Sequence, residues 1–202
     1  MPQVPIRHSA GRTFPAHVFS GHHFPKQVFA AADGYFLFFE FARAFSEGAW
    51  CMFVRLAREF GDQMVWAKTV EPDPISFYEA NFGEVAEFKF SADDSAGTYT
   101  SQMHNWPTAS IADAIAYRSD VVAWAGTSGR WAAWGERELN LCVLHVVAQE
   151  RLVKELVLMP DDFVPLFAVE DALSNVVSSE LGAQELAAFA NEMRQSYPAT
   201  RG

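Results

Sequence analysis

The chain has 202 residues, a formal net charge of −10 and a pI near 5.0, and half of its residues are hydrophobic. This length fits a single domain, and this share of apolar residues excludes a chain that is disordered throughout. The negative charge, with no run of basic residues to offset it, argues against a nucleic-acid partner, because phosphates are neutralised by clustered Lys and Arg. It is compatible with a protein partner that has a basic surface.

Neither a secretory signal nor a membrane span is predicted. Residues 1–15 contain no apolar stretch of the length that a signal peptide needs, so a cytoplasmic location is expected. The most apolar stretch, Tyr35–Leu56, is interrupted by charged residues, which is typical of a protein core and not of a bilayer span. Those charged residues are Glu40, Arg43, Glu47 and Arg55.

Residues 1–34 are predicted to form an extended arm, separate from an α+β domain over residues 35–202. The arm contains four of the six histidines and repeats the pattern Phe-Pro-x-x-Val-Phe at residues 14–19 and 24–29. Proline biases the residue before it toward extended backbone, so the repeat predicts two short edge strands joined through residues 20–23. Four regularly spaced phenylalanines would be poorly placed in water. The arm is therefore expected to dock on the domain, or on a second copy in a homo-oligomer.

In the first half of the domain, residues 35–41 are compatible with either a strand or the start of a helix. Apolar residues then recur at intervals of three and four up to Phe60, which predicts a helix ended by Gly61. Asp73, followed by a proline, predicts a capped short helix that stops at Gly83. Two strands are predicted on either side of this helix, at residues 63–70 and 84–90.

Residues 91–106 are polar and predict a loop, with room for a short strand near Tyr99. Ser110, with Asp113 three residues later, resembles a capping box and predicts a helix that ends near Arg118.

The clearest pattern, residues 121–147, predicts a long β-hairpin at the centre of an antiparallel sheet. Two runs rich in β-branched and aromatic residues flank residues 126–129, where glycines allow the positive φ of a tight turn. In the second run apolar and polar residues alternate, which predicts one strand with a single wet face. Gly135 within that run predicts a bulge or a sharp bend. The residues expected to be buried are Leu139, Leu141 and Val143.

Toward the C-terminus, residues 152–158 fit either a strand or a helical turn, and apolar spacing predicts two helices at residues 169–181 and 185–197. Strands and helices neither alternate strictly nor segregate fully along the chain. This mixture predicts a single α+β domain with a mostly antiparallel sheet and helices packed on one face.

Cys51 and Cys142 both lie in apolar stretches and are predicted to be small core residues. They show no CxxC spacing, and the neighbours His22 and His23 point in opposite directions on an extended chain, so no metal site is predicted. Cys142 and His145 fall on opposite faces of one strand and are not expected to form a catalytic pair.

No catalytic constellation is predicted. Ser128 lies in a short turn and lacks the strand-to-helix elbow of the GxSxG motif. The glycine-rich turns that bind nucleotides, GxGxxG and GxxxxGK[ST], do not occur, and no cofactor is expected. An enzyme is therefore the less favoured class of protein.

The candidate binding residues surround the predicted bulge. They are Trp131, Trp134, Glu136, Arg137 and Glu138. Tryptophans beside charged residues are common in binding sites and also at ordinary sheet rims, and both interpretations stay open. The Trp-Gly-Glu-Arg-Glu run at residues 134–138, followed by an alternating strand, resembles small bacterial immunity-type and accessory proteins.

The sequence supports two hypotheses for the function of the protein. The preferred hypothesis is a non-catalytic interaction protein, of the immunity or accessory kind, whose acidic surface faces a basic protein partner. The alternative is a small-molecule-binding protein or enzyme with a pocket between the Trp-rich sheet and the helices. Glu136 and Glu138, expected on the wet face beside Trp134, are the first acidic residues to test.

Overall fold

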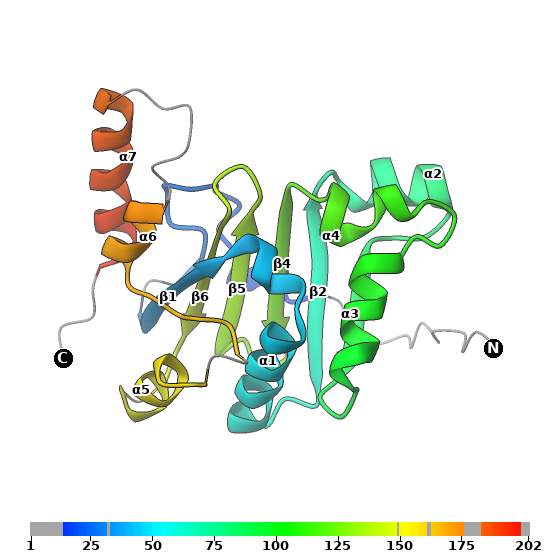
Figure 1. Cartoon of the computed structure of the whole chain (residues 1–202), viewed down its shortest axis with the longest axis horizontal. Coiled ribbons are helices and arrows are strands. Elements are labelled where there is room, and N and C mark those ends of the chain that lie inside the picture. The colour runs from blue at the N-terminus through cyan, green and yellow to red at the C-terminus, as the bar shows by residue number, and fades with distance from the viewer. Residues whose placement is uncertain (1–13, 32, 149, 161–162, 176–182, 199–202) are drawn as a thin grey trace.

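The structure, a computed structural model, describes residues 14–31, 33–148, 150–160, 163–175 and 183–198. Its centre is a six-stranded antiparallel sheet in the order β1-β6-β5-β4-β2-β3 (Figure 1). The strands are β1 (Tyr35–Glu40), β2 (Met64–Glu71), β3 (Glu87–Ser91), β4 (Val121–Gly126), β5 (Trp131–Glu136) and β6 (Leu141–Val146). The predicted single α+β domain is thereby confirmed. Among the described residues, no helix has both the length and the apolar character of a membrane span.

The central pattern forms a three-stranded meander and not the single hairpin predicted from it. β4 and β5 are joined by the predicted turn, but the second run folds back at residues 137–140 and supplies both β5 and β6. Asn140 lies in this second turn with a φ of 46°, a left-handed conformation that asparagine tolerates. Its backbone carbonyl accepts from the Phe41 N–H, and its side chain accepts from the Ala42 N–H. Periodicity hid this turn because its charged residues continue the alternation of the strands.

Both faces of the meander are buried, so the predicted wet face is wrong. Every residue of β4, β5 and β6 is buried. The second turn reverses the parity, so that Trp131 faces one side of the sheet while Leu141 and Val143 face the other. Leu141 and Val143 are buried as predicted, whereas Leu139 lies in the turn and is only partly buried.

Gly135 marks close packing and not a bulge, because it pairs in regular register with both neighbouring strands. A Cβ atom there would lie 2.7 Å from the Phe41 ring and closer still to the Cys142 thiol, so glycine alone fits without a shift. The irregularity in the sheet lies instead in β2, between Thr69 and Glu71.

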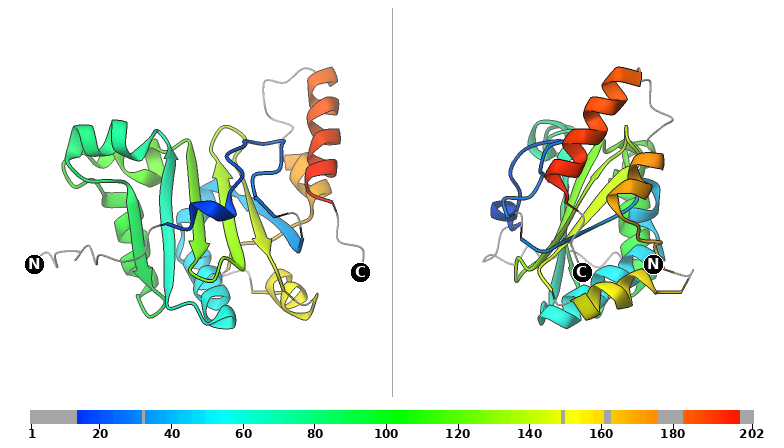
Figure 2. Two further views of the ribbon diagram at one scale, coloured as in Figure 1. Left: turned by 180° about the vertical axis from the view of Figure 1, so that it is seen from behind. Right: turned by 90° about the vertical axis from the view of Figure 1, so that its left-hand side faces the viewer.

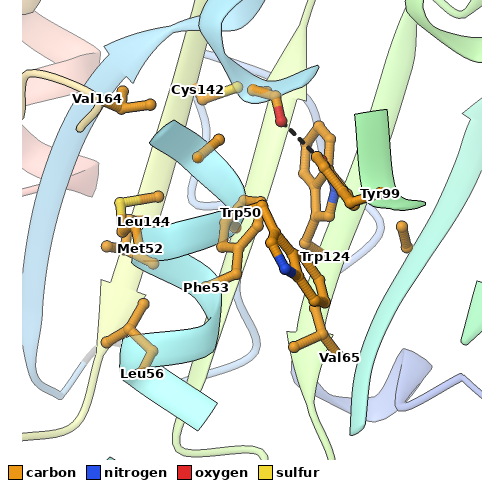
Figure 3. Close-up of a cluster of buried hydrophobic side chains, with 14 of the residues drawn as sticks. Trp50, Met52, Phe53, Leu56, Val65, Tyr99, Trp124, Cys142, Leu144 and Val164 are labelled. Carbon is orange, nitrogen blue, oxygen red and sulfur yellow. Dashed lines mark hydrogen bonds between the residues drawn. The ribbon is translucent and has the colours of Figure 1, made fainter. Parts of the chain in front are cut away.

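One face of the sheet is covered by α1 (Glu47–Phe60), α3 (Ala96–Asn105) and the 3-10 turn η2 (Phe41–Phe45) (Figure 1). Stacked aromatic rings fill the space beneath them (Figure 3). The Phe53 ring centroid lies 5.7 Å from those of both Trp124 and Trp131, and Trp50 stacks on Tyr99 at 5.0 Å. We call this face the helix side.

Residues 96–105 form α3, so the predicted loop is wrong. Ser95 caps the helix by accepting from the Thr98 N–H at 3.1 Å. Only Tyr99 and Met103, which are one turn apart, are fully buried. Because the other residues of the helix are mostly polar or small, the sequence shows only a weak helical periodicity of apolar residues. The Tyr99 hydroxyl donates to the Ala44 carbonyl oxygen at 2.6 Å, which anchors the helix to η2.

Other elements lie where the sequence places them. α1 begins after the capping Ser46 and ends at Gly61, which is left-handed. Asp73 caps the π-helical turn η3 (Pro74–Glu79), which continues into α2 (Ala80–Phe82) and stops at the left-handed Gly83. The two ambiguous segments form strand β1 and helix α5 (Glu150–Val157).

The helix predicted after Ser110 is divided into the 3-10 turn η4 (Ile111–Asp113) and the short α4 (Ile115–Arg118). The Ser110 hydroxyl donates to the Asp113 carboxylate at 2.6 Å and does not cap a backbone N–H.

The opposite face of the sheet is covered by the N-terminal arm, with α6 (Val169–Asn175) and α7 (Ala183–Ser196) beside β1 (Figure 2). Phe14, Phe24 and Phe29 of the arm are buried in the cluster on this face, so docking on the domain is confirmed for the described part of the arm. Helices contribute to both faces, and the expectation of helices on one face is too narrow. The last six residues of the helix predicted at 169–181 lie outside the described residues. We call this face the arm side.

The arm does not form two edge strands. Ala16–Val18 is a 3-10 turn (η1), and a single antiparallel bridge joins Phe19 to Phe29. The arm lies across the face of the sheet and not beside its edge (Figure 2), so no strand is available to pair with its backbone.

Both edges of the sheet are partly occupied. At β1, Phe38 and Phe167 exchange two backbone hydrogen bonds of 2.8 and 2.9 Å. At β3, the Ser91 N–H donates to the Asp94 carboxylate, the Ser91 carbonyl oxygen accepts from the Asp94 N–H, and the Glu87 N–H turns back to a local carbonyl oxygen. Such edges resist pairing with another chain.

Candidate functional site

The five predicted residues lie on two faces of the sheet and in the second turn. Trp131 faces the helix side, while Trp134 and Glu136 lie together on the arm side. Arg137 and Glu138 belong to the turn, and of the five only Glu138 is exposed. The structure therefore joins one pair of the predicted set and separates the rest.

The Glu136 carboxylate is the centre of a polar cluster beneath the arm. Its Oε1 accepts from the Trp134 indole N–H at 2.8 Å and from the Phe24 backbone N–H at 2.9 Å. His23 Nδ1 lies 3.3 Å from the same oxygen, and His23 Nε2 lies 3.3 Å from Glu71 Oε1. His23 thus bridges carboxylates from β5 and β2, and we call these residues the Glu136 cluster.

Burial raises the pKa of Glu136 above its ordinary value, and hydrogen bonds from Trp134 and Phe24 and the proximity of His23 oppose this effect only in part. A carboxyl group with a raised pKa beside an imidazole has the elements of a proton-transfer site. Here, however, its donors are a core indole and the backbone of the arm itself. The contacts of the cluster hold the arm against the sheet.

Sequence reasoning missed His23 and Glu71 as partners of Glu136. Glu136 and the Phe24 N–H that it binds are 112 residues apart, and no local pattern connects residues at that separation. The only sequence signal was the repeated phenylalanine spacing, which predicted that the arm docks but not where.

Arg137 fixes the second turn to the end of α4. Its Nε donates to the Ser119 carbonyl oxygen at 2.7 Å, and a terminal nitrogen donates to the Ala116 carbonyl oxygen at 3.0 Å. The guanidinium also lies 5.0 Å from the centroid of the Phe41 ring. Burial lowers the pKa of Arg137, and the charge of Asp120 opposes that shift. These contacts give Arg137 a structural role at a helix C-terminus.

Asp62 is a second buried carboxylate, and the sequence did not single it out. It accepts from the Thr127 hydroxyl at 2.7 Å, from the N–H and hydroxyl of Ser128, and from the Trp131 indole N–H at 3.0 Å. A Cβ atom at Gly126 would collide with this carboxylate, which explains the glycine at that position. Ser128 is therefore a turn residue, as predicted.

Neither cysteine forms part of a polar site, and both are free. Cys142 is buried on the helix side, and burial raises the pKa of its thiol. Cys51 is exposed on α1, so its predicted core position is wrong; apolar neighbours in sequence do not fix the face of a helix on which a residue lies. His145 lies on the opposite face of β6 from Cys142, as parity predicts, and burial lowers its pKa. In the described ranges, no group of three or more His, Cys, Asp or Glu residues is arranged to hold a metal ion.

The run at residues 134–138 has a structural explanation in this fold. Trp134 binds Glu136, Gly135 admits Phe41, and Arg137 closes the turn. No protein-family model, curated protein or solved structure matches the chain. The resemblance of this run to immunity-type proteins is therefore not supported by any related protein.

The negative charge of the protein is concentrated in residues 71–94, which we call the acidic segment. This segment contains seven acidic residues and one lysine, a net charge of −6 out of the −10 of the whole chain. Its acidic residues are Glu71, Asp73, Glu79, Glu84, Glu87, Asp93 and Asp94. Of these residues, Asp73 caps η3 as predicted, accepting from the Ile75 and Ser76 N–H groups.

An open depression of about 390 Å³ lies within the acidic segment, between α2 and β3. It is lined by Glu79, Gly83, Glu84, Val85 and Glu87. Glu84 accepts from the Trp106 indole N–H at 2.7 Å, and Glu87 lies 3.6 Å from Lys68 Nζ. Both Glu79 and Glu84 are exposed, so their charge faces solvent.

Proposed function

We propose that the protein is a non-catalytic, cytoplasmic interaction protein, of the bacterial immunity or accessory kind, that binds a protein partner through an acidic surface. The observation that carries this proposal is the concentration of negative charge in the acidic segment, where the exposed carboxylates of Glu79 and Glu84 line an open depression. Such a surface raises the rate of encounter with a basic partner and makes the association sensitive to salt.

The alternative, a small-molecule pocket between the Trp-rich sheet and the helices, is less well supported. Phe53, Trp124 and Trp131 stack in that space, and each has a side chain with no exposed surface. The depression in the acidic segment is open and lies away from this stack. Of the two glutamates expected on a wet face beside Trp134, Glu136 is bound to the arm and only Glu138 is exposed.

The test is purification of the tagged full-length protein from its native cell at low and at high ionic strength, followed by direct binding of each purified candidate. We expect a protein partner with a basic surface, whose affinity falls steeply as the salt concentration rises. A partner whose affinity is unchanged by salt, or a small molecule that the purified protein binds or converts, would contradict the proposal.

A further inference from the structure

Exposed apolar side chains accompany the acidic segment. Among the described residues, five large apolar side chains are exposed, and three of them are Ile75 at 61%, Ile111 at 58% and Tyr117 at 54%. They belong to η3, η4 and α4, short helical elements that lie near the C-terminal end of β2 and the start of β4 (Figure 1). We call η3, α2, η4 and α4 together the lobe.

Contacts across the lobe join these elements into one body. The Arg118 guanidinium of α4 lies 5.2 Å from the centroid of the Phe77 ring in η3. The Tyr78 hydroxyl donates to the Asp113 carbonyl oxygen of η4 and is 3.3 Å from the Ser119 hydroxyl. The elements that expose Ile75, Ile111 and Tyr117 are therefore neighbours, and large apolar side chains that are exposed in one region of a protein are typical of interaction sites.

Asp73, Glu79 and Glu84 are exposed acidic residues in or next to η3 and α2, and Arg118 is an exposed basic residue of α4. Ile75 lies between Asp73 and Glu79 in the chain, and the depression with Glu79 and Glu84 adjoins η3 through α2. Apolar side chains within a charged rim are the usual anatomy of a protein-binding surface.

We propose that the lobe is the docking surface of the protein, and that it binds a basic segment of a protein partner in which apolar side chains are flanked by Lys or Arg. This inference rests on the proposed function and names its surface. A second copy of the chain is opposed as occupant by charge, because each copy carries a net charge of −10. Nucleic acids and anionic lipid surfaces are opposed for the same reason.

The probe is a nine-residue peptide of arginines with leucine at its second, fifth and eighth positions, titrated into the full-length protein at low salt. A matched peptide carries serine in place of leucine. Amide chemical shifts locate the bound peptide, and the same titration gives its Kd. The variants are Ile75→Ser with Ile111→Ser, and Glu79→Gln with Glu84→Gln, whose side-chain amide at position 84 keeps an oxygen for the Trp106 indole N–H. The control, Glu59→Gln with Glu138→Gln, removes the same charge from exposed positions on α1 and the second turn.

We expect the largest shifts within residues 73–84 and 111–118. The affinity should weaken about tenfold in the isoleucine variant and by a similar factor in the lobe glutamate variant, but less than about twofold in the control. The serine peptide should bind more weakly than the leucine peptide. Unchanged melting of the variants establishes that they are folded, since all substituted side chains are exposed.

Three results would overturn the inference. Shifts centred elsewhere, or equal loss of affinity in the control and the lobe glutamate variant, would leave an acidic interaction protein with a different surface. Self-association of the protein alone, abolished by the isoleucine variant, would make a second copy the occupant. Failure of both peptides to bind anywhere at low salt would contradict the proposed function as well.

Discussion

The helix side and the arm side of the sheet are both closed, but by different means. Helices α1 and α3 satisfy their own backbone groups, so the surface between them and the sheet is filled mainly by aromatic rings. The arm is irregular, and its N–H and C=O groups need partners from elsewhere. Glu136 accepts from the Phe24 N–H, while the Tyr197 hydroxyl accepts from the Val28 N–H and donates to the Lys26 carbonyl oxygen.

This difference explains why buried polar side chains lie beneath the arm. A side chain such as Tyr197, only 1% exposed, replaces the strand or helix partner that the arm backbone lacks. Losing such a hydrogen bond costs about 1–3 kcal/mol, whereas losing a core ring costs about 3–5 kcal/mol. We therefore expect the loss of one contact on the helix side to cost more free energy of unfolding than the loss of one contact beneath the arm. The arm side should accordingly open first.

Leu141→Asp should have the largest effect. Leu141 is fully buried on the arm side of β6, and an unpaired carboxylate there has no compensating partner. We expect the variant to be insoluble or unfolded by circular dichroism. A variant that folds with an unchanged melting temperature would mean that β6 is placed wrongly.

Deleting residues 1–30 should have the next largest effect. The deletion exposes the arm side of the sheet and removes three buried phenylalanines, each worth roughly 1.5–3 kcal/mol of burial. We expect a lower free energy of unfolding in urea, and sedimentation shows whether a homo-oligomer is also lost. An equal free energy of unfolding with and without residues 1–30 would contradict a structural role for the arm.

Phe53→Ala should destabilise the helix side by about 3–5 kcal/mol, because it opens a cavity between the Trp124 and Trp131 rings. Urea unfolding measures this loss. Tyr197→Phe is the matched arm-side change, since it keeps the ring and removes only the hydroxyl, and should cost about 1–3 kcal/mol. An equal decrease in the free energy of unfolding for the two variants would contradict the proposed difference between the two sides.

Glu136→Gln should change the free energy of unfolding least at any single pH, but it should change how that free energy depends on pH. The pKa of Glu136 is raised in the folded state above its ordinary value of 4.5, so the folded protein holds this proton in a range where the unfolded chain has released it. Its contribution to stability is therefore present below pH 4.5 and falls as pH rises through the folded pKa. Relative to the variant, the free energy of unfolding of the natural protein should therefore decline as the pH rises from 4.5 through the pKa of Glu136 in the folded state. A difference that does not vary with pH would contradict the raised pKa.

Much of the fold follows from local sequence signals. Asp73 and Gly61 set helix ends that depend on neighbouring residues only, and they lie where predicted. The second turn of the meander was missed because its conformation rests on Asn140 and on contacts with the distant Phe41. α3 was missed because only two of its residues reach the core.

The candidate site was harder to predict for the same physical reason. Trp134 and Glu136 are two residues apart on one strand, so their contact is local. Their burial depends on the arm, whose Phe24 and His23 come from more than a hundred residues away. The acidic segment is visible in the sequence as composition, but the lobe is created by tertiary contacts such as that of Arg118 with Phe77.

Native-state hydrogen exchange tests the difference between the two sides most directly. The amides of Phe24 and Val28 report the opening of the arm, and those of Phe53 and Val54 report α1. We predict that the arm amides exchange through a local opening at least about 1 kcal/mol below the global free energy of unfolding, while the α1 amides exchange only on global unfolding. Equal opening free energies at all four amides would show that the two sides form one cooperative unit and would contradict this account.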